Sequence, residues 1–99
     1  MEITEVKIFL RNEDKLRAFV NVTFDNCFVV RGLKVINGPE GFFVSMPSRK
    51  VEDGTFRDIT HPITREFRDK LEKIILEKYR EEAAHEGAFV TRPIEYPSR

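Results

Sequence analysis

At 99 residues the chain has the length of one domain. Its 17 basic and 17 acidic residues balance to a formal net charge of zero, so no long-range field attracts polyanions indiscriminately, and any nucleic-acid binding must be local. No segment approaches the roughly 18 apolar residues that span a bilayer, and a single cysteine excludes an intramolecular disulfide. We therefore expect a cytoplasmic protein that does not contact membranes.

Two segments with alternating apolar and polar residues open the chain. Residues 2–11 show this period, and residues 16–25 repeat it after a polar turn at 12–15. A period of two is typical of a strand with one buried face, so the two segments predict a β-hairpin. A third apolar run follows at 28–37 and contains Gly32, where the missing side chain favours a bulge or a close neighbour.

A turn and a fourth strand are predicted next. The sequence GPEG at 38–41 is typical of a turn. Residues 42–46 then form a short apolar run that Pro47 ends. We expect Cys27, between the second and third runs, to be a small, partly buried strand residue.

A long helix is predicted after these strands. It begins near Pro62, which a first helical turn tolerates because its missing N–H would have no partner there. Thr60 or Thr64 can cap the helix, and Gly87 can end it. Apolar residues recur along it at helical spacing: Ile63, Phe67, Leu71 and Ile74.

The order of these elements predicts the fold class. We expect an α+β fold, in which an antiparallel sheet of about four strands is followed by one long C-terminal helix. A single domain is expected over residues 1–86, with a variable C-terminal tail over residues 87–99.

The apolar surface of the predicted helix is wider than one sheet face needs. At about 100° per residue it continues beyond the main stripe, onto Ile75, Leu76 and Tyr79. A small soluble monomer seldom exposes such a patch, so we expect these residues to contact a partner, most simply a second copy in a homodimer.

Catalytic and metal sites are not indicated by any spacing in the chain. Ser45, Ser48, Asp58 and His61 lie close in sequence, but no nucleophile-elbow, phosphate-loop or dinucleotide motif surrounds them. His61 and His85 do not have the spacing of zinc ligands. We expect no enzymatic activity, no small-molecule substrate, no metal and no cofactor.

Five cations surround the loop between the fourth strand and the helix. They are Arg49, Lys50, Arg57, Arg65 and Arg68. Such cations suit phosphate contacts, but acidic residues are interleaved with them: Glu52, Asp53, Asp58, Glu66 and Asp69. Composition and spacing therefore leave two interpretations open, a nucleic-acid-binding loop and a salt-bridged, solvated surface.

Three motifs of this region resemble the signature of a known family. FVSMPSRK at 43–50, DGTFRDI at 53–59 and THPI at 60–63 are similar to the bacterial stage V sporulation protein G family, also called septation regulators. MEITEVKI, RAFVNVTFD and FVVRGLKVING extend the resemblance over about residues 1–80.

The resemblance implies a small cytoplasmic bacterial regulator that dimerises and binds DNA and RNA without catalysing a reaction. Family members are linked to sporulation, to asymmetric septation and cell division, and to wider gene regulation. The resemblance directs attention to Arg49, Lys50 and the following helix, hence also to Arg57, Arg65 and Arg68. It carries no function onto the tail.

Two functions are therefore considered. The first is a regulatory protein that binds DNA, with RNA as a second ligand, through phosphate contacts from the basic loop and the helix start. In it, the turn at Asp53 and Gly54 sets the spacing between Lys50 and Arg57. The alternative is a protein-interaction regulator of cell division that uses the apolar helix surface and does not bind nucleic acid directly.

Overall fold

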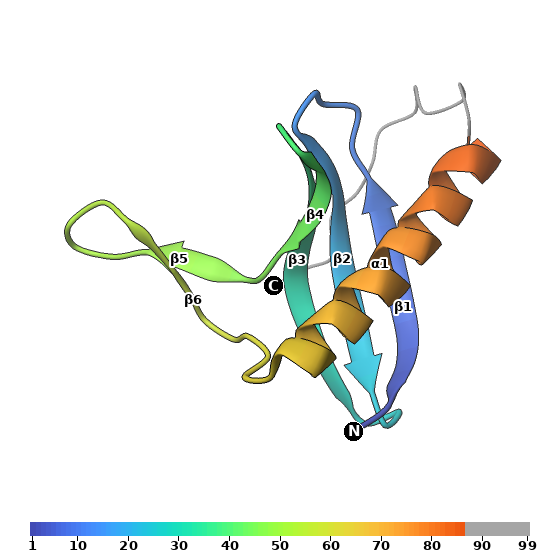
Figure 1. Cartoon of the computed structure of the whole chain (residues 1–99), viewed down its shortest axis with the longest axis horizontal. Coiled ribbons are helices and arrows are strands. Elements are labelled where there is room, and N and C mark those ends of the chain that lie inside the picture. The colour runs from blue at the N-terminus through green and yellow to red at the C-terminus, as the bar shows by residue number, and fades with distance from the viewer. Residues whose placement is uncertain (87–99) are drawn as a thin grey trace.

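The sheet and the helix of the protein pack as two layers. The computed structural model describes residues 1–86. The strands are β1 (Ile3–Leu10), β2 (Leu16–Phe24), β3 (Phe28–Gly38), β4 (Gly41–Ser45), β5 (Ser48–Lys50) and β6 (Phe56–Asp58), followed by helix α1 (Arg65–Glu86). β1 to β4 form an antiparallel sheet in the order of the sequence, and β5 and β6 form a separate two-stranded sheet. Helix α1 crosses one face of the larger sheet (Figure 1). The predicted α+β fold is confirmed, and the predicted tail lies outside the described residues.

The turn between β2 and β3 corrects the prediction for Cys27. Asp25 and Asn26 have φ angles of 51° and 54°, as in the mirror-image turns that match the twist of hairpins. The Cys27 amide donates to the carbonyl of Phe24 at 3.0 Å and so closes this turn. Cys27 is therefore an exposed turn residue and not a partly buried strand residue.

The predicted irregularity at Gly32 is a β-bulge. The register shifts between the pairs Val20–Leu33 and Val22–Val30, and Gly32 has a φ of 87° that few other residues adopt. A bulge adds one residue on one strand, so Val30 and Leu33 both keep the side of the sheet that their β2 partners occupy. This side is the one that helix α1 covers.

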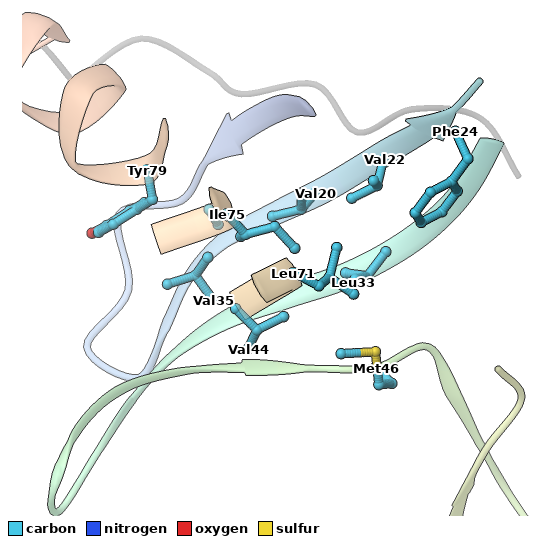
Figure 2. Close-up of a cluster of buried hydrophobic side chains, with 11 residues drawn as sticks. Val20, Val22, Phe24, Leu33, Val35, Val44, Met46, Leu71, Ile75 and Tyr79 are labelled. Atoms are coloured by element: carbon cyan, nitrogen blue, oxygen red, sulfur yellow. The ribbon is translucent and has the colours of Figure 1, made fainter. Parts of the chain in front are cut away.

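The core lies between the sheet and the helix. Figure 2 shows side chains from β2, β3 and β4 meeting side chains from α1. The buried cluster contains Ala18, Val20, Val22, Phe24, Leu33, Val35, Val44, Met46, Leu71, Ile75 and Tyr79. At about 1.5–3 kcal/mol for each fully buried large aliphatic or aromatic side chain, this cluster is the main source of stability.

Helix α1 begins at Arg65, slightly later than predicted. Thr64, one of the two predicted caps, accepts a hydrogen bond at its Oγ1 from the amide of Phe67 at 3.2 Å. Ile63 consequently lies outside the helix and is 91% exposed. The prediction that Ile63 belongs to the buried helical stripe is therefore wrong.

The helix surface that was predicted to be spare is largely used within the chain itself. Ile75 and Tyr79 are 0% and 4% exposed, and Leu76 packs against the same core. The Tyr79 hydroxyl accepts a hydrogen bond from Arg17 Nε at 3.2 Å, and its ring meets Phe42 edge-on. Because α1 crosses the sheet from β4 to β1, one face of the sheet needs a wide apolar sector. The inference that Ile75 and Tyr79 are free for a partner was wrong for this reason.

Candidate nucleic-acid interface

The predicted basic loop is a β-hairpin that leaves the body of the molecule. We call residues 48–58, which comprise β5, β6 and their turn, the arm. Figure 1 shows the arm extending away from the larger sheet and from α1. Its base is closed by a hydrogen bond from the Ile59 amide to the Pro47 carbonyl at 2.7 Å. Only Ser48 and Val51 of the arm are partly covered, so its other side chains are presented to solvent.

The predicted turn at Asp53 and Gly54 closes the arm. The Val51 amide donates to Thr55 O at 2.8 Å, and the Gly54 amide donates to Val51 O at 3.0 Å. Gly54 has a φ of 90°, the conformation that a three-residue hairpin loop requires at its last position. The turn therefore fixes the register of the residues that follow.

Asp53 stabilises this turn through its side chain. Its Oδ1 accepts hydrogen bonds from the amide of Thr55 at 3.0 Å and from its hydroxyl at 2.6 Å. The bond from the Thr55 hydroxyl, followed by the bond from its amide, lowers the pKa of the Asp53 carboxyl. The carboxylate is thus occupied within the turn rather than directed at an arginine.

Two arginines face each other across the arm. Arg49 on β5 is the direct partner of Arg57 on β6, and the Cβ atoms of such opposed residues lie about 5 Å apart. Both side chains are exposed, and within residues 1–86 no ion pair involves either of them. A shallow hollow of about 650 Å³ lies beside them. The register therefore gathers two positive charges that the sequence separates by a turn.

Lys50 has a different position from its neighbour Arg49. It borders the same hollow, but its cross-strand partner is Phe56. Because side chains alternate along a strand, Lys50 and Phe56 lie on the face of the arm opposite Arg49 and Arg57. The arm thus has a face with two arginines and a second face that carries an exposed aromatic ring.

Arg65 and Arg68 form a second basic group at the start of α1. They border a separate hollow of about 400 Å³. Arg65 Nε lies 3.9 Å from Asp69 Oδ2, but both side chains are highly exposed, so this pair contributes little. The five predicted cations therefore form two groups in one chain, because the arm does not fold back over the helix start.

Metal clusters and membrane-spanning helices were searched for in the described part of the chain. Among residues 1–86, no group of three His, Cys, Asp or Glu side chains is placed to hold a metal ion. His61 Nδ1 lies 3.0 Å from the carbonyl oxygen of Pro62, to which it donates when it carries the proton. Over the same residues, no helix is both long and apolar enough to cross a membrane.

These features define a class of protein: a small α+β domain with a curved antiparallel sheet, one covering helix and a protruding hairpin on which two arginines face each other. Comparison with known families identifies the class more closely. The SpoVG family model matches residues 1–81, and the chain belongs to this family. The resemblance inferred from the motifs is confirmed over the whole range that carried it.

Several curated relatives are highly similar to the chain. A SpoVG protein of Bdellovibrio bacteriovorus is 55% identical over 87 residues, which cover 88% of this chain and 81% of the relative. One of Anaeromyxobacter sp. is 50% identical over 92 residues, covering 93% and 91%. One of Myxococcus xanthus is 45% identical over 95 residues, covering 94% and 96%. The names of these proteins refer to septation.

Proposed function

We propose that the protein is a cytoplasmic bacterial regulator that binds nucleic acid without catalysing a reaction. DNA is the first ligand to consider and RNA the second. The observation that carries the proposal is the opposition of Arg49 and Arg57 across the arm. Membership of the SpoVG family supports a regulatory role connected with septation and sporulation.

Electrostatic repulsion between Arg49 and Arg57 favours the binding of an anion to the pair. Like charges directly opposite each other destabilise an antiparallel pair. Glu52 and Asp53 line the same hollow, but within residues 1–86 no acidic side chain forms an ion pair with Arg49 or Arg57. Phosphates that bind the two guanidinium groups, one on each, remove the repulsion. Each guanidinium can also donate two parallel hydrogen bonds to phosphate oxygens, which a lysine cannot do.

Contacts of this kind favour sequence-independent binding with moderate affinity. Two phosphates bound by the arm would contribute a slope of about −1.8 to the dependence of log K on log salt for B-DNA, at about −0.9 for each phosphate. The zero net charge of the chain adds no long-range attraction. Binding therefore depends on local contacts and on the simultaneous use of several basic groups.

The test is a salt titration of binding to duplex DNA and to single-stranded RNA. The Arg49→Ala/Arg57→Ala variant is compared with the native chain and with Lys50→Ala. We expect the double variant to lose at least tenfold in affinity at low salt and about 1.8 units of slope for each engaged arm. The Lys50→Ala control removes one charge of the same arm from the other face and is expected to lose less. Equal slopes for the native chain and the double variant would contradict the proposal.

The alternative function, docking of a protein partner, is favoured at a different place from the one predicted. Ile75 and Tyr79 belong to the core, whereas Phe56 and Ile63 are 68% and 91% exposed. If the native chain binds neither DNA nor RNA at low salt, these exposed residues are where a protein partner is to be sought.

A further inference from the structure

The face of the larger sheet opposite α1, which we call the outer face, contains two buried side chains. Ala18, Val20 and Val22 of β2 belong to the core under α1, so Phe19 and Asn21 between them point to the outer face. Both are 8% exposed, and Phe19 is not part of the core cluster. Among residues 1–86, no helix or strand packs on the outer face (Figure 1). The uncovered face of an antiparallel sheet is normally solvated, so the burial of these two side chains indicates a further layer.

Phe19 lies at the centre of an aromatic and cationic patch on the outer face. Its cross-strand partners are Phe9 on β1 and Lys34 on β3. Arg11 Cζ lies 5.9 Å and Lys34 Nζ lies 6.0 Å from the centroid of the Phe19 ring, within the range of a cation–π interaction. The stems of such long side chains cover apolar surface while their charges stay at its margin. The outer face thus presents aromatic rings bordered by positive charge.

Asn21 has a buried hydrogen-bond acceptor that lacks a donor. Its side-chain Oδ1 is buried, and within residues 1–86 no group donates a hydrogen bond to it, its cross-strand neighbour Lys7 included. A buried acceptor without a donor costs free energy, and nearly all such groups in native proteins are paired. The N–H groups of the sheet itself point along the sheet toward neighbouring strands. A backbone N–H of a segment that crosses the outer face would supply the donor.

The tail, residues 87–99, can reach this face from the end of α1. Ile74 and Lys78 of α1 border a hollow together with Val6 of β1, so the later turns of the helix lie at this strand (Figure 1). β1 is an edge of the sheet, and α1 ends at Glu86. At about 3.3 Å for each extended residue the tail can span roughly 40 Å, whereas β1 and β3 are separated by two strand spacings, about 10 Å. The tail is therefore long enough to pass the β1 edge and cross the outer face.

The composition of the tail matches the chemistry of the outer face. Pro93 and Pro97 fix their own φ angles and disfavour a helix at the residue before each, which suits a segment that crosses a face in extended form. Glu95 is the one acidic residue of the tail and complements the positive charges that border the aromatic rings. The larger apolar residues of the tail are Phe89, Val90, Ile94 and Tyr96.

We propose that the tail docks on the outer face of its own chain, crosses it from β1 toward β3, and covers Phe9 and Phe19. In this arrangement a backbone N–H of the tail donates to Asn21 Oδ1, and Glu95 pairs with Lys7 or Lys34. The sheet becomes the middle of three layers, with α1 on one face and the tail on the other. The proposal goes beyond the binding of nucleic acid by the arm and does not depend on it.

Two other arrangements compete with this docking. In the first, the tail pairs along the edge of β1 as a fifth strand, which would protect the edge amides of β1 and leave the outer face uncovered. In the second, the outer face is covered by another copy of the chain, and the cover would then depend on protein concentration. The test therefore reports on the outer face itself and is made at two protein concentrations.

The first measurement is the reaction of a thiol on the outer face with N-ethylmaleimide, a neutral reagent. The reporter chain is Cys27→Ser/Asn21→Cys, and the tail is then changed by Phe89→Asp/Ile94→Asp. A buried thiol reacts slowly, so we expect the thiol at position 21 to react at least tenfold faster when the tail is changed. Thr91→Asp/Ser98→Asp, which adds the same charge without removing apolar residues, should change the rate less than twofold. Cys27 of the chain with Asn21 intact is exposed and should react equally with every tail.

The second measurement is NMR spectroscopy of the native chain, which decides the question even where a variant fails to fold by circular dichroism. We expect nuclear Overhauser contacts from the Phe19 ring to Phe89, Ile94 or Tyr96, and from an amide proton of the tail to the Asn21 side chain. Absence of these contacts, or equal thiol rates with the native and the apolar-depleted tail, would overturn the proposal. Contacts of the tail with the β1 edge alone would replace it by edge pairing. A thiol rate that falls as the protein concentration rises would assign the cover to a second copy and refute docking within the chain.

Discussion

The body of the protein, which consists of the larger sheet (β1 to β4) and helix α1, differs from the arm in how its side chains are covered. In the body, a cluster of apolar residues from β2, β3, β4 and α1 is buried, and Ile75 is completely buried. In the arm, an aromatic ring is exposed and two arginines face each other. The body is therefore stable by itself, whereas the arm contains the features that a binding partner would stabilise. Substitutions in the body should change folding, and substitutions in the arm should change binding.

The largest expected effect comes from the core. Replacing a buried Ile with Ala costs about 2–5 kcal/mol, because transfer energy is lost and a cavity remains. We therefore expect Ile75→Ala, at a position that is 0% exposed, to lower the free energy of unfolding by about 3 kcal/mol in urea titrations. The matched control is Ile63→Ala, at a position 91% exposed, which should change it by less than about 0.5 kcal/mol. Both are measured at low protein concentration, so that association does not contribute. A similar loss in both variants would contradict the assignment of Ile75 to the core and of Ile63 to the exposed surface.

The start of the helix provides the next largest effect. Thr64 Oγ1 accepts a hydrogen bond from the Phe67 amide, and loss of such a cap costs about 1 kcal/mol. We expect Thr64→Ala to lower the free energy of unfolding by this amount. Thr60→Ala is the control, since Thr60 precedes the helix without capping it. A larger loss in Thr60→Ala than in Thr64→Ala would show that the cap is misassigned.

The contrast between body and arm also explains which structural elements could be predicted from the sequence and which could not. β1 and β2 were predictable because their side chains alternate, β3 and β4 because they are apolar runs bounded by a turn and by Pro47, and α1 because its apolar residues recur at helical spacing. β5 and β6 were not predicted, because strands of only three residues are too short to show such a period. The roles of Ile63 and Tyr79 were misjudged for a related reason: periodicity does not reveal where the helix begins or how obliquely it crosses the sheet. The basic residues were identified, but their partners across the arm depend on the register of the turn.

A smaller effect should distinguish the stability of the arm's hairpin conformation from the affinity of the arm for DNA. Arg57→Glu places opposite charges across the arm in place of like charges, which favours the hairpin by about 0.2–1 kcal/mol. We expect the amides of the arm to exchange more slowly by NMR and binding to DNA to be lost at the same time. Lys50→Glu, opposite Phe56, is the control for the change in net charge. If Arg57→Glu orders the arm and keeps native affinity, the arginine pair is not the phosphate contact.

The smallest effect concerns the turn of the arm in acid. Hydrogen bonds from Thr55 lower the pKa of Asp53 below its ordinary value of 3.8, so the folded turn prefers the ionised carboxylate. The stabilisation is fully present above the ordinary pKa and is lost as the pH falls through the lowered value. We expect the Thr55 amide resonance to remain unchanged from pH 8 to 5 and to move toward a disordered position below pH 4. Asp53→Asn should remove this transition but leave the buried amides of β2 and β3 unaffected. If those core amides responded together with Thr55, the arm and the body would unfold as one unit, and the contrast between them would not hold.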